Sequence, residues 1–180
     1  MSISHNGQLS VEIFKSIPPV PINVLYPPSL SFLVEPTFRI FISTMKITPD
    51  LFTAHKTTHR AKYDEARTLL PNPADMTQEI LLVNQGGHIM EGSFTTPYFF
   101  RDGVWITPDR SCGGNLGTTR RYALEWGLCQ EGFVEAESVQ VGDMVVLSNG
   151  VRGFGLGRVE VLPEKKGFMS KNMAGTGCQQ

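Results

Sequence analysis

The sequence predicts an α+β fold with a mostly antiparallel β core and two or three helices. Apolar, strand-like runs recur between residues 80 and 162, turn residues separate many of them, and two segments carry helical spacing. The chain has 180 residues, of which 41% are hydrophobic, so it can bury a core of its own.

A proline-rich segment lies between two short strand-like runs near the N-terminus. The runs are Val11–Phe14 and Phe38–Ile42, and prolines stand at positions 18, 19, 21, 27, 28 and 36. Because proline lacks a backbone N–H and interrupts helices, we expect a long extended connection here, without a helix or a central strand.

The first helix is expected directly after a basic segment, HKTTHR. Tyr63, Ala66, Arg67 and Leu70 recur at helical spacing, and Pro71 stops the pattern.

Four strands are expected after this helix, with Asn84–Gly87 and Arg101–Gly103 as turns between them. These strands are Ile80–Val83, His88–Ser93, Thr96–Phe100 and Val104–Thr107.

A glycine-rich loop precedes the second helix. Either Thr118 or Thr119 can cap this helix, which is expected to end near Gly127.

Further strands are expected at Met144–Leu147 and Arg158–Leu162, followed by a polar, frayed tail. The glycines between residues 153 and 157 suggest a dinucleotide-binding loop, but a strand-like run follows them instead of a helix, so we reject that interpretation.

The overall charge excludes several classes of partner. Lys and Arg number 16 and Asp and Glu 17, which argues against binding to nucleic acid or to a membrane surface. Cys112, Cys129 and Cys178 form no CxxC pair, so neither a metal site nor a disulfide framework is expected. Without a secretory signal or a long apolar stretch, we expect a cytoplasmic protein.

Two loops have the character of anion-binding sites. Gly117, Thr118 and Thr119 open a helix, where backbone N–H groups are unpaired and the dipole favours negative charge. Ser148 and Asn149 follow an apolar strand, so the two loops could hold one phosphate from two sides. The alternative is an ordinary capped loop.

Glu91 and two lysines are the remaining candidates for chemistry. Glu91 lies in a strand, where a carboxylate facing a pocket could keep a ring nitrogen protonated, or it is an exposed polar position at the strand end. Lys56 and Lys62 lie among His55, His59 and Arg60, and a lysine with cationic neighbours can form a Schiff base. The alternative is a solvated helix start.

Taken in order, these motifs resemble the class IV (fold type IV) family of pyridoxal 5'-phosphate enzymes. That family includes branched-chain and D-amino-acid aminotransferases and aminodeoxychorismate lyase. The similarity covers about residues 37–160, and the residues of these motifs are closest to those of fungal members described as aminodeoxychorismate lyase-like.

The resemblance implies a role for each candidate residue. Lys56 matches the catalytic lysine that binds the cofactor covalently and moves the Cα proton, and Lys62 is left as a solvated residue. Glu91 matches the acid that pairs with the pyridine nitrogen, with Tyr63 and Arg60 as supporting groups. The remaining matches are phosphate-side positions, namely Gly117, Thr118, Thr119, Ser148 and Asn149.

The sequence departs from the family pattern in two places. The usual Leu-Pro-Gly approach to the phosphate turn is replaced by GNLG at residues 114–117. Only 55 residues precede Lys56, so we expect the small N-terminal domain to be largely missing. We therefore expect residues 1–45 to be a remnant of that domain with the proline-rich connection, residues 46–163 the cofactor-binding domain, and residues 164–180 a flexible tail.

The resemblance implies either transfer of an amino group between amino acids and 2-oxo acids or formation of 4-aminobenzoate from aminodeoxychorismate. It also implies a homo-oligomer acting on a small-molecule substrate. Two alternatives stay open: a shortened, non-catalytic relative that binds the cofactor or a partner protein, and an incomplete gene model.

Overall fold

The computed structural model describes residues 2–3, 6–10, 22–33 and 35–163 of the chain. Within these ranges one mixed sheet of eight strands forms the centre of the molecule, and β1 (Ser2–Ile3) pairs separately with β2 (Leu9–Ser10). The strands of the large sheet are β3 (Pro36–Ile47), β4 (Gln78–Asn84), β5 (Ile89–Gly92), β6 (Thr96–Arg101), β7 (Val104–Pro108), β8 (Gln130–Gly132), β9 (Met144–Asn149) and β10 (Gly153–Val159).

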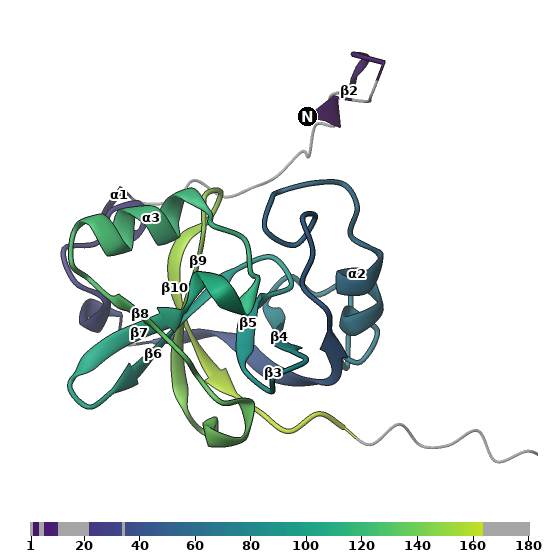
Figure 1. Ribbon diagram of the computed structural model, residues 1–180. Coiled ribbons are helices and arrows are strands. Elements are labelled where there is room, and N and C mark those ends of the chain that lie inside the picture. The colour runs from purple at the N-terminus through teal and green to yellow at the C-terminus, as the bar shows by residue number, and fades with distance from the viewer. Residues whose placement is uncertain (1, 4–5, 11–21, 34, 164–180) are drawn as a thin grey trace, which may run out of the picture.

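The order across the large sheet is β5-β4-β3-β10-β9-β6-β7-β8 (Figure 1). Antiparallel pairs join β5 to β4, β10 to β9, β9 to β6 and β6 to β7. Parallel pairs join β3 to β4 and to β10, and β7 to β8. The α+β prediction is confirmed, and the sheet is more mixed than the sequence suggested.

Three α-helices lie in the described ranges: α1 (Ile22–Leu25), α2 (Ala61–Arg67) and α3 (Thr118–Glu125). Single 3-10 turns occur at η1 (Leu30–Phe32), η2 (Arg110–Cys112) and η3 (Ala136–Ser138). The helices α2 and α3 are the two that helical spacing predicts. None of the described helices is long and apolar enough to cross a bilayer.

The expectation of a fully extended proline-rich segment is wrong, because α1 and η1 both lie within it. The four residues of α1 contain no proline and form a single turn, which fits between Pro21 and Pro27 in the sequence. The predicted strand Val11–Phe14 and the tail 164–180 fall outside the described residues.

Several strand boundaries also differ from the predictions. β3 is longer than the expected Phe38–Ile42 and spans the predicted boundary at residue 45, β8 was not expected, and β10 begins at Gly153 instead of Arg158. A Cβ on Gly155 would lie 2.7 Å from Cε2 of Phe38, and one on Gly157 would lie 2.5 Å from Cδ1 of Ile40. These glycines therefore let β10 lie close to β3, which explains glycine within a strand.

Alternating residues of the sheet form its two apolar faces. On one face Ile40, Leu81, Val145 and neighbouring side chains form a buried cluster. On the other face α2 packs on Phe41, Ile80 and Leu82, and α3 packs on Tyr98 and Val146. The two helices thus cover different parts of the sheet, and in Figure 1 the loop between β3 and α2 arches above the space between them.

Candidate active site

A cavity of about 1040 Å³ lies between the N-terminal ends of α2 and α3 and the loop that precedes α2. Its volume matches the larger small-molecule sites of proteins. Five segments distant in sequence meet here. The residues that the resemblance assigned to the site all line the cavity: Lys56, Glu91, Gly117, Thr118, Thr119, Ser148 and Asn149.

Glu91 supplies a buried carboxyl group to the cavity wall. It stands on β5 opposite Leu82 and is 7% exposed, so its alternative interpretation as an exposed strand end is wrong. The Tyr63 hydroxyl and the backbone N–H of Asn115 both donate hydrogen bonds to its carboxylate. Burial raises the pKa of Glu91 from its ordinary value of 4.5 to about 7, against the opposing effect of these hydrogen bonds.

Tyr63 contacts Glu91 directly, and Arg60 packs against Tyr63. Burial and the neighbouring Glu91 raise the pKa of Tyr63, so its hydroxyl stays protonated and acts as a donor. Cζ of Arg60 lies 5.0 Å from the centre of the Tyr63 ring, and the Arg60 guanidinium donates a hydrogen bond to the carbonyl of Ser93. These contacts join the start of α2 to the end of β5.

A second acid, Glu79, lies behind this wall and was missed by the sequence analysis. It is fully buried, and burial raises its pKa. Its carboxylate accepts hydrogen bonds from the backbone and hydroxyl of Ser93 and from the hydroxyl of Thr95. Nη1 of Arg67 lies 3.8 Å from Oε1 of Glu79 and 2.8 Å from Oγ of Ser93. The cluster of Glu79, Arg67, Ser93 and Thr95 holds the turn that follows Glu91 in place.

The N-terminus of α3 forms the opposite wall. Gly117 is the N-cap in extended conformation, no side chain caps the helix, and the first helical hydrogen bond runs from Arg121 N–H to the Gly117 carbonyl. The expectation that Thr118 or Thr119 caps the helix is therefore wrong, because both lie in its first turn. The first N–H groups of α3 have no partner within the helix, which suits an anion.

A chain of hydroxyl groups orients Thr119. The Ser148 hydroxyl donates to Oγ1 of Thr119 over 2.9 Å, and the Tyr98 hydroxyl lies 2.8 Å from Oγ of Ser148. Since Tyr98 can donate to Ser148 and Ser148 donates to Thr119, the hydroxyl hydrogen of Thr119 is left to donate to a group in the cavity. Ser148 acts through Thr119 in this arrangement.

Asn149 builds the turn between β9 and β10. Its Oδ1 accepts hydrogen bonds from the backbone N–H groups of Val151 and Arg152 at 3.0 and 2.8 Å, and its Nδ2 donates to the Phe94 carbonyl. The side chain of Asn149 is thus occupied in holding the turn against the wall that carries Glu91.

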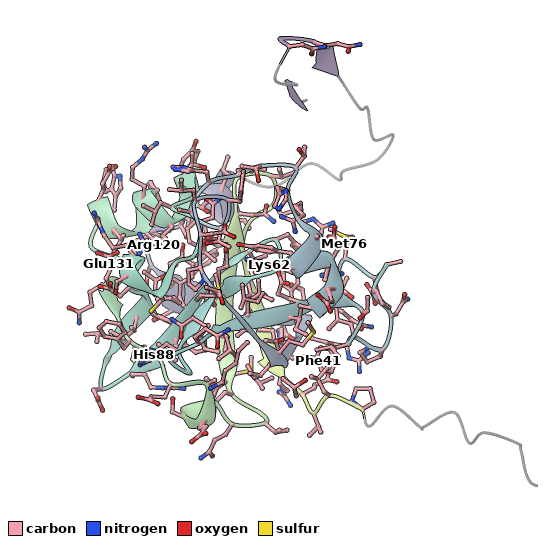
Figure 2. The ribbon with its side chains drawn as sticks, turned by 45° about the vertical axis from the view of Figure 1, so that its right-hand side comes forward. Phe41, Lys62, Met76, His88, Arg120 and Glu131 are labelled. Atoms are coloured by element: carbon pink, nitrogen blue, oxygen red, sulfur yellow. The ribbon has the colours of Figure 1, made fainter. Side chains whose placement is uncertain are left out.

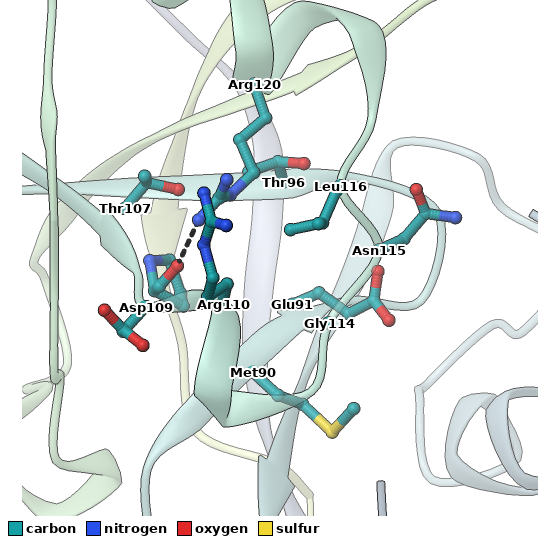
Figure 3. Close-up of a pocket in the computed structure, with 11 residues that line it drawn as sticks. Met90, Glu91, Thr96, Thr107, Asp109, Arg110, Gly114, Asn115, Leu116 and Arg120 are labelled. Atoms are coloured by element: carbon teal, nitrogen blue, oxygen red, sulfur yellow. Dashed lines mark hydrogen bonds between the residues drawn. The ribbon is translucent and has the colours of Figure 1, made fainter. Parts of the chain in front are cut away.

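Arg120 anchors α3 from the other side. Its Nη2 donates to the Pro108 carbonyl over 2.9 Å and pairs with Glu131, while the Glu91 and Asn115 side chains lie apart from its guanidinium (Figure 3). Arg120 therefore contributes to the position of the anion-binding turn.

The two candidate lysines occupy different environments. Lys56 is exposed, lines the cavity and has no hydrogen bond or ion pair within the described part of the chain. Lys62, labelled in Figure 2, does not line the cavity; its Nζ lies 2.8 Å from Oδ2 of Asp50 and donates to the Thr48 carbonyl. Lys62 is exposed, as expected, but its charge is paired.

Comparison with known proteins shows the family of the chain. The family model described as amino-transferase class IV matches residues 16–156. The chain belongs to the class IV aminotransferase family. An aminodeoxychorismate lyase of Saccharomyces cerevisiae is 32% identical over an alignment of 140 residues, and the match covers 68% of this chain and 37% of that protein.

Solved structures of the family share the fold. A putative amino-acid aminotransferase from Mesorhizobium loti gives a TM-score of 0.56 at 27% identity, covering 71% of this chain and 63% of that one. The branched-chain amino acid aminotransferase of Escherichia coli gives a TM-score of 0.53 at 24% identity. The match covers 69% of this chain and 44% of that one. The chain therefore spans less than two thirds of the length of these relatives, and well under half of the yeast lyase.

Proposed function

We propose that the protein is a pyridoxal 5'-phosphate-dependent enzyme in which Lys56 is the catalytic amine. The observation that carries this proposal is that Lys56, Glu91, the N-terminus of α3 and the turn after β9 all line one cavity. The family to which the chain belongs supports the choice of cofactor.

The residues of the cavity fit this cofactor at each of its polar ends. The unpaired N–H groups at the start of α3 and the free hydroxyl hydrogen of Thr119 suit the phosphate. Gly117 and Thr118 complete this turn, and Ser148 and Asn149 support it from β9. Glu91 suits the ring nitrogen, because an ionised carboxylate stabilises a protonated nitrogen.

When bound, pyridoxal 5'-phosphate supplies the electron sink that lets an amino-acid substrate lose its Cα proton. Lys56 accepts this proton and returns it, and the absence of an ion pair at its amine within the described residues leaves it available for both roles. Glu91 would hold a proton on the ring nitrogen, and Tyr63 and the Asn115 N–H keep the Glu91 carboxylate in position. Thr119 and the start of α3 would hold the phosphate.

Two reactions of this class are supported by different observations. The family model supports transfer of an amino group between an amino acid and a 2-oxo acid. The similarity to the yeast lyase supports formation of 4-aminobenzoate from aminodeoxychorismate. We favour assignment of the chain to the lyase-like members of the family. A shortened relative that binds the cofactor without turnover is the alternative.

Apolar side chains at the cavity favour association with a second copy of the chain. Phe52, Leu116 and Val151 line the cavity, and each is about half exposed, at 51%, 49% and 49%. Exposed apolar groups that cluster at one site favour contact with another protein surface. We therefore propose a homo-oligomer.

The proposal is tested by adding pyridoxal 5'-phosphate to the purified chain and recording its visible spectrum. We expect a yellow, stoichiometric complex that survives gel filtration. Amino transfer to 2-oxoglutarate and release of 4-aminobenzoate are then measured on this complex. A complex without turnover in either assay favours the non-catalytic alternative, and the absence of a complex refutes the proposed function.

A further inference from the structure

A buried hydrogen bond joins Tyr63 on α2 to Glu91 on β5 at the cavity wall. The Tyr63 hydroxyl donates to Oε1 of Glu91, and each of the two residues is 7% exposed. Both residues also line the cavity. The Tyr63 hydroxyl forms no second hydrogen bond with the part of the chain that the structure describes, so its single hydrogen is committed to Glu91.

Two sets of contacts fix the orientation of Tyr63. Its ring belongs to the buried cluster that includes Phe41 and Ile80. Cζ of Arg60 lies 5.0 Å from the centre of the ring, and the Arg60 guanidinium donates a hydrogen bond to the Ser93 carbonyl. The positive charge of Arg60 acts to lower the pKa of the phenol, although burial dominates and raises it, so Arg60 makes the hydroxyl a better donor.

The charge state of Glu91 results from groups that act in opposite directions. Burial, and to a smaller extent the neighbouring Glu79, raise its pKa. The Tyr63 hydroxyl, the Asn115 N–H and the positive charge of Arg60 lower it. The resulting pKa is about 7, so the ionised and the protonated carboxyl have similar free energies near neutral pH. A single contact is therefore enough to favour one of the two forms.

Glu91 and a ring nitrogen beside it would share one proton. The proton can reside on the carboxyl or on the nitrogen, and the total charge of the pair is the same in both cases. A donor binds an ionised carboxylate about twice as strongly as a neutral group. Because Tyr63 donates to Glu91, it favours the form in which the carboxylate is ionised and the nitrogen carries the proton.

We infer that Tyr63 is a positioning residue that keeps this proton on the ring nitrogen of the cofactor and off Glu91. The inference rests on the proposed function and deepens it, because the electron sink depends on the protonated nitrogen. Tyr63 acts through Glu91. Arg60 acts in the same direction with a smaller effect, because it contacts Tyr63 instead of the carboxylate.

Tyr63→Phe tests the inference, since it removes the hydroxyl and keeps the ring. The first measurement is the titration of the Glu91 carboxyl in the cofactor-free protein by carbon NMR, with Glu91→Gln identifying the signal. We expect the midpoint to rise by about one to two pH units, which is the contribution of a hydrogen bond to a charged group. Tyr122→Phe is the matched control, because the Tyr122 hydroxyl donates to the Pro27 carbonyl and does not line the cavity. It should leave the midpoint unchanged.

The second measurement is nitrogen NMR of bound pyridoxal 5'-phosphate that is labelled at its ring nitrogen. The wild type and Tyr122→Phe should give the chemical shift of a protonated ring nitrogen. Tyr63→Phe should move the shift toward the value of the unprotonated nitrogen, which Glu91→Gln defines. A purely structural role of Tyr63 would lower the thermal midpoint and leave this chemical shift unchanged.

A wild-type midpoint and chemical shift in Tyr63→Phe would overturn the inference. If Tyr63→Phe does not fold, Arg60→Met is used instead, and it should raise the Glu91 midpoint by a smaller amount; an unchanged midpoint would count against the inference. A protein that binds no pyridoxal 5'-phosphate would refute the proposed function, and the titration of the cofactor-free protein would still decide whether Tyr63 controls the charge of Glu91. The two failures are therefore distinguishable.

Discussion

The two walls that carry Glu91 and Lys56 are held in very different ways. Glu91 is buried, accepts two hydrogen bonds, and is backed by the fully buried cluster around Glu79. The loop with Lys56 is largely exposed and is attached by the Lys62–Asp50 ion pair and by a ring contact of Phe52 with His59 at 4.5 Å. One wall is thus preorganised for binding, and the other leaves the amine free to move.

The largest expected effect comes from Lys56→Ala. Turnover should fall to the background level, because the proposed base and covalent attachment point are both lost. The thermal midpoint should change little, because Lys56 is exposed and makes no polar contact in the described structure. Amino-transfer and lyase assays, combined with thermal unfolding, measure both effects.

Lys62→Ala is the control for this variant. It should keep activity, since an exposed ion pair adds little to stability and Lys62 does not line the cavity. If Lys62→Ala abolishes turnover and Lys56→Ala does not, the assignment of the two lysines is reversed.

Glu79→Ala tests the rigidity of the buried wall. Removing one partner of a buried pair costs about 3–5 kcal/mol, because Arg67 loses its charge partner and the donors of Ser93 and Thr95 lose their acceptor. Urea denaturation measures this loss. Glu65→Ala, an exposed change on α2, should alter the free energy of unfolding by no more than about 0.5 kcal/mol. Similar values for the two variants would contradict the role of the cluster.

The pH dependence of stability tests the burial of Glu91. A carboxyl with a higher pKa in the folded protein stabilises it below pH 4.5, and this stability is lost as the pH rises to about 7. The loss should be on the order of 3 kcal/mol for the cofactor-free protein. Glu91→Gln should flatten the profile in this window, and an unchanged profile would place Glu91 in contact with solvent.

The smallest expected effects separate Thr119 from Ser148. Thr119→Ala removes a direct donor to the phosphate, so the affinity for pyridoxal 5'-phosphate should fall roughly ten- to a hundredfold. Ser148→Ala only releases Thr119 from its orienting bond and should weaken binding less. Absorbance titrations give both affinities. A larger effect of Ser148→Ala would show that Ser148 contacts the phosphate itself.

The sequence revealed those parts of the site that stand in local motifs. Lys56 and the two turns each follow or precede a recognisable element and Glu91 lies within a strand, so their convergence could be expected. Glu79 could not, because its burial arises from Ser93 and Thr95 folding back over β4, a contact between residues distant in sequence. The signal in the sequence that could have identified Glu79 is an acidic residue directly before the apolar run of β4.

The same limit applies to the fold. The helices α2 and α3 have clear spacing, whereas β10 was misplaced because Gly155 and Gly157 have no side chains to form a pattern. Their reason for being glycine lies in the neighbouring strand, at Phe38 and Ile40. The start of β10 therefore depends on contacts between strands, which the periodicity of the sequence does not show.

The central claim is that Lys56 binds the cofactor within this cavity. The direct measurement is reduction of the pyridoxal 5'-phosphate complex with borohydride, followed by proteolysis and mass spectrometry. The account predicts a stable phosphopyridoxyl group on Lys56 and an unmodified Lys62. A modification on Lys62 or distributed over surface lysines, with Lys56 unmodified, would contradict it.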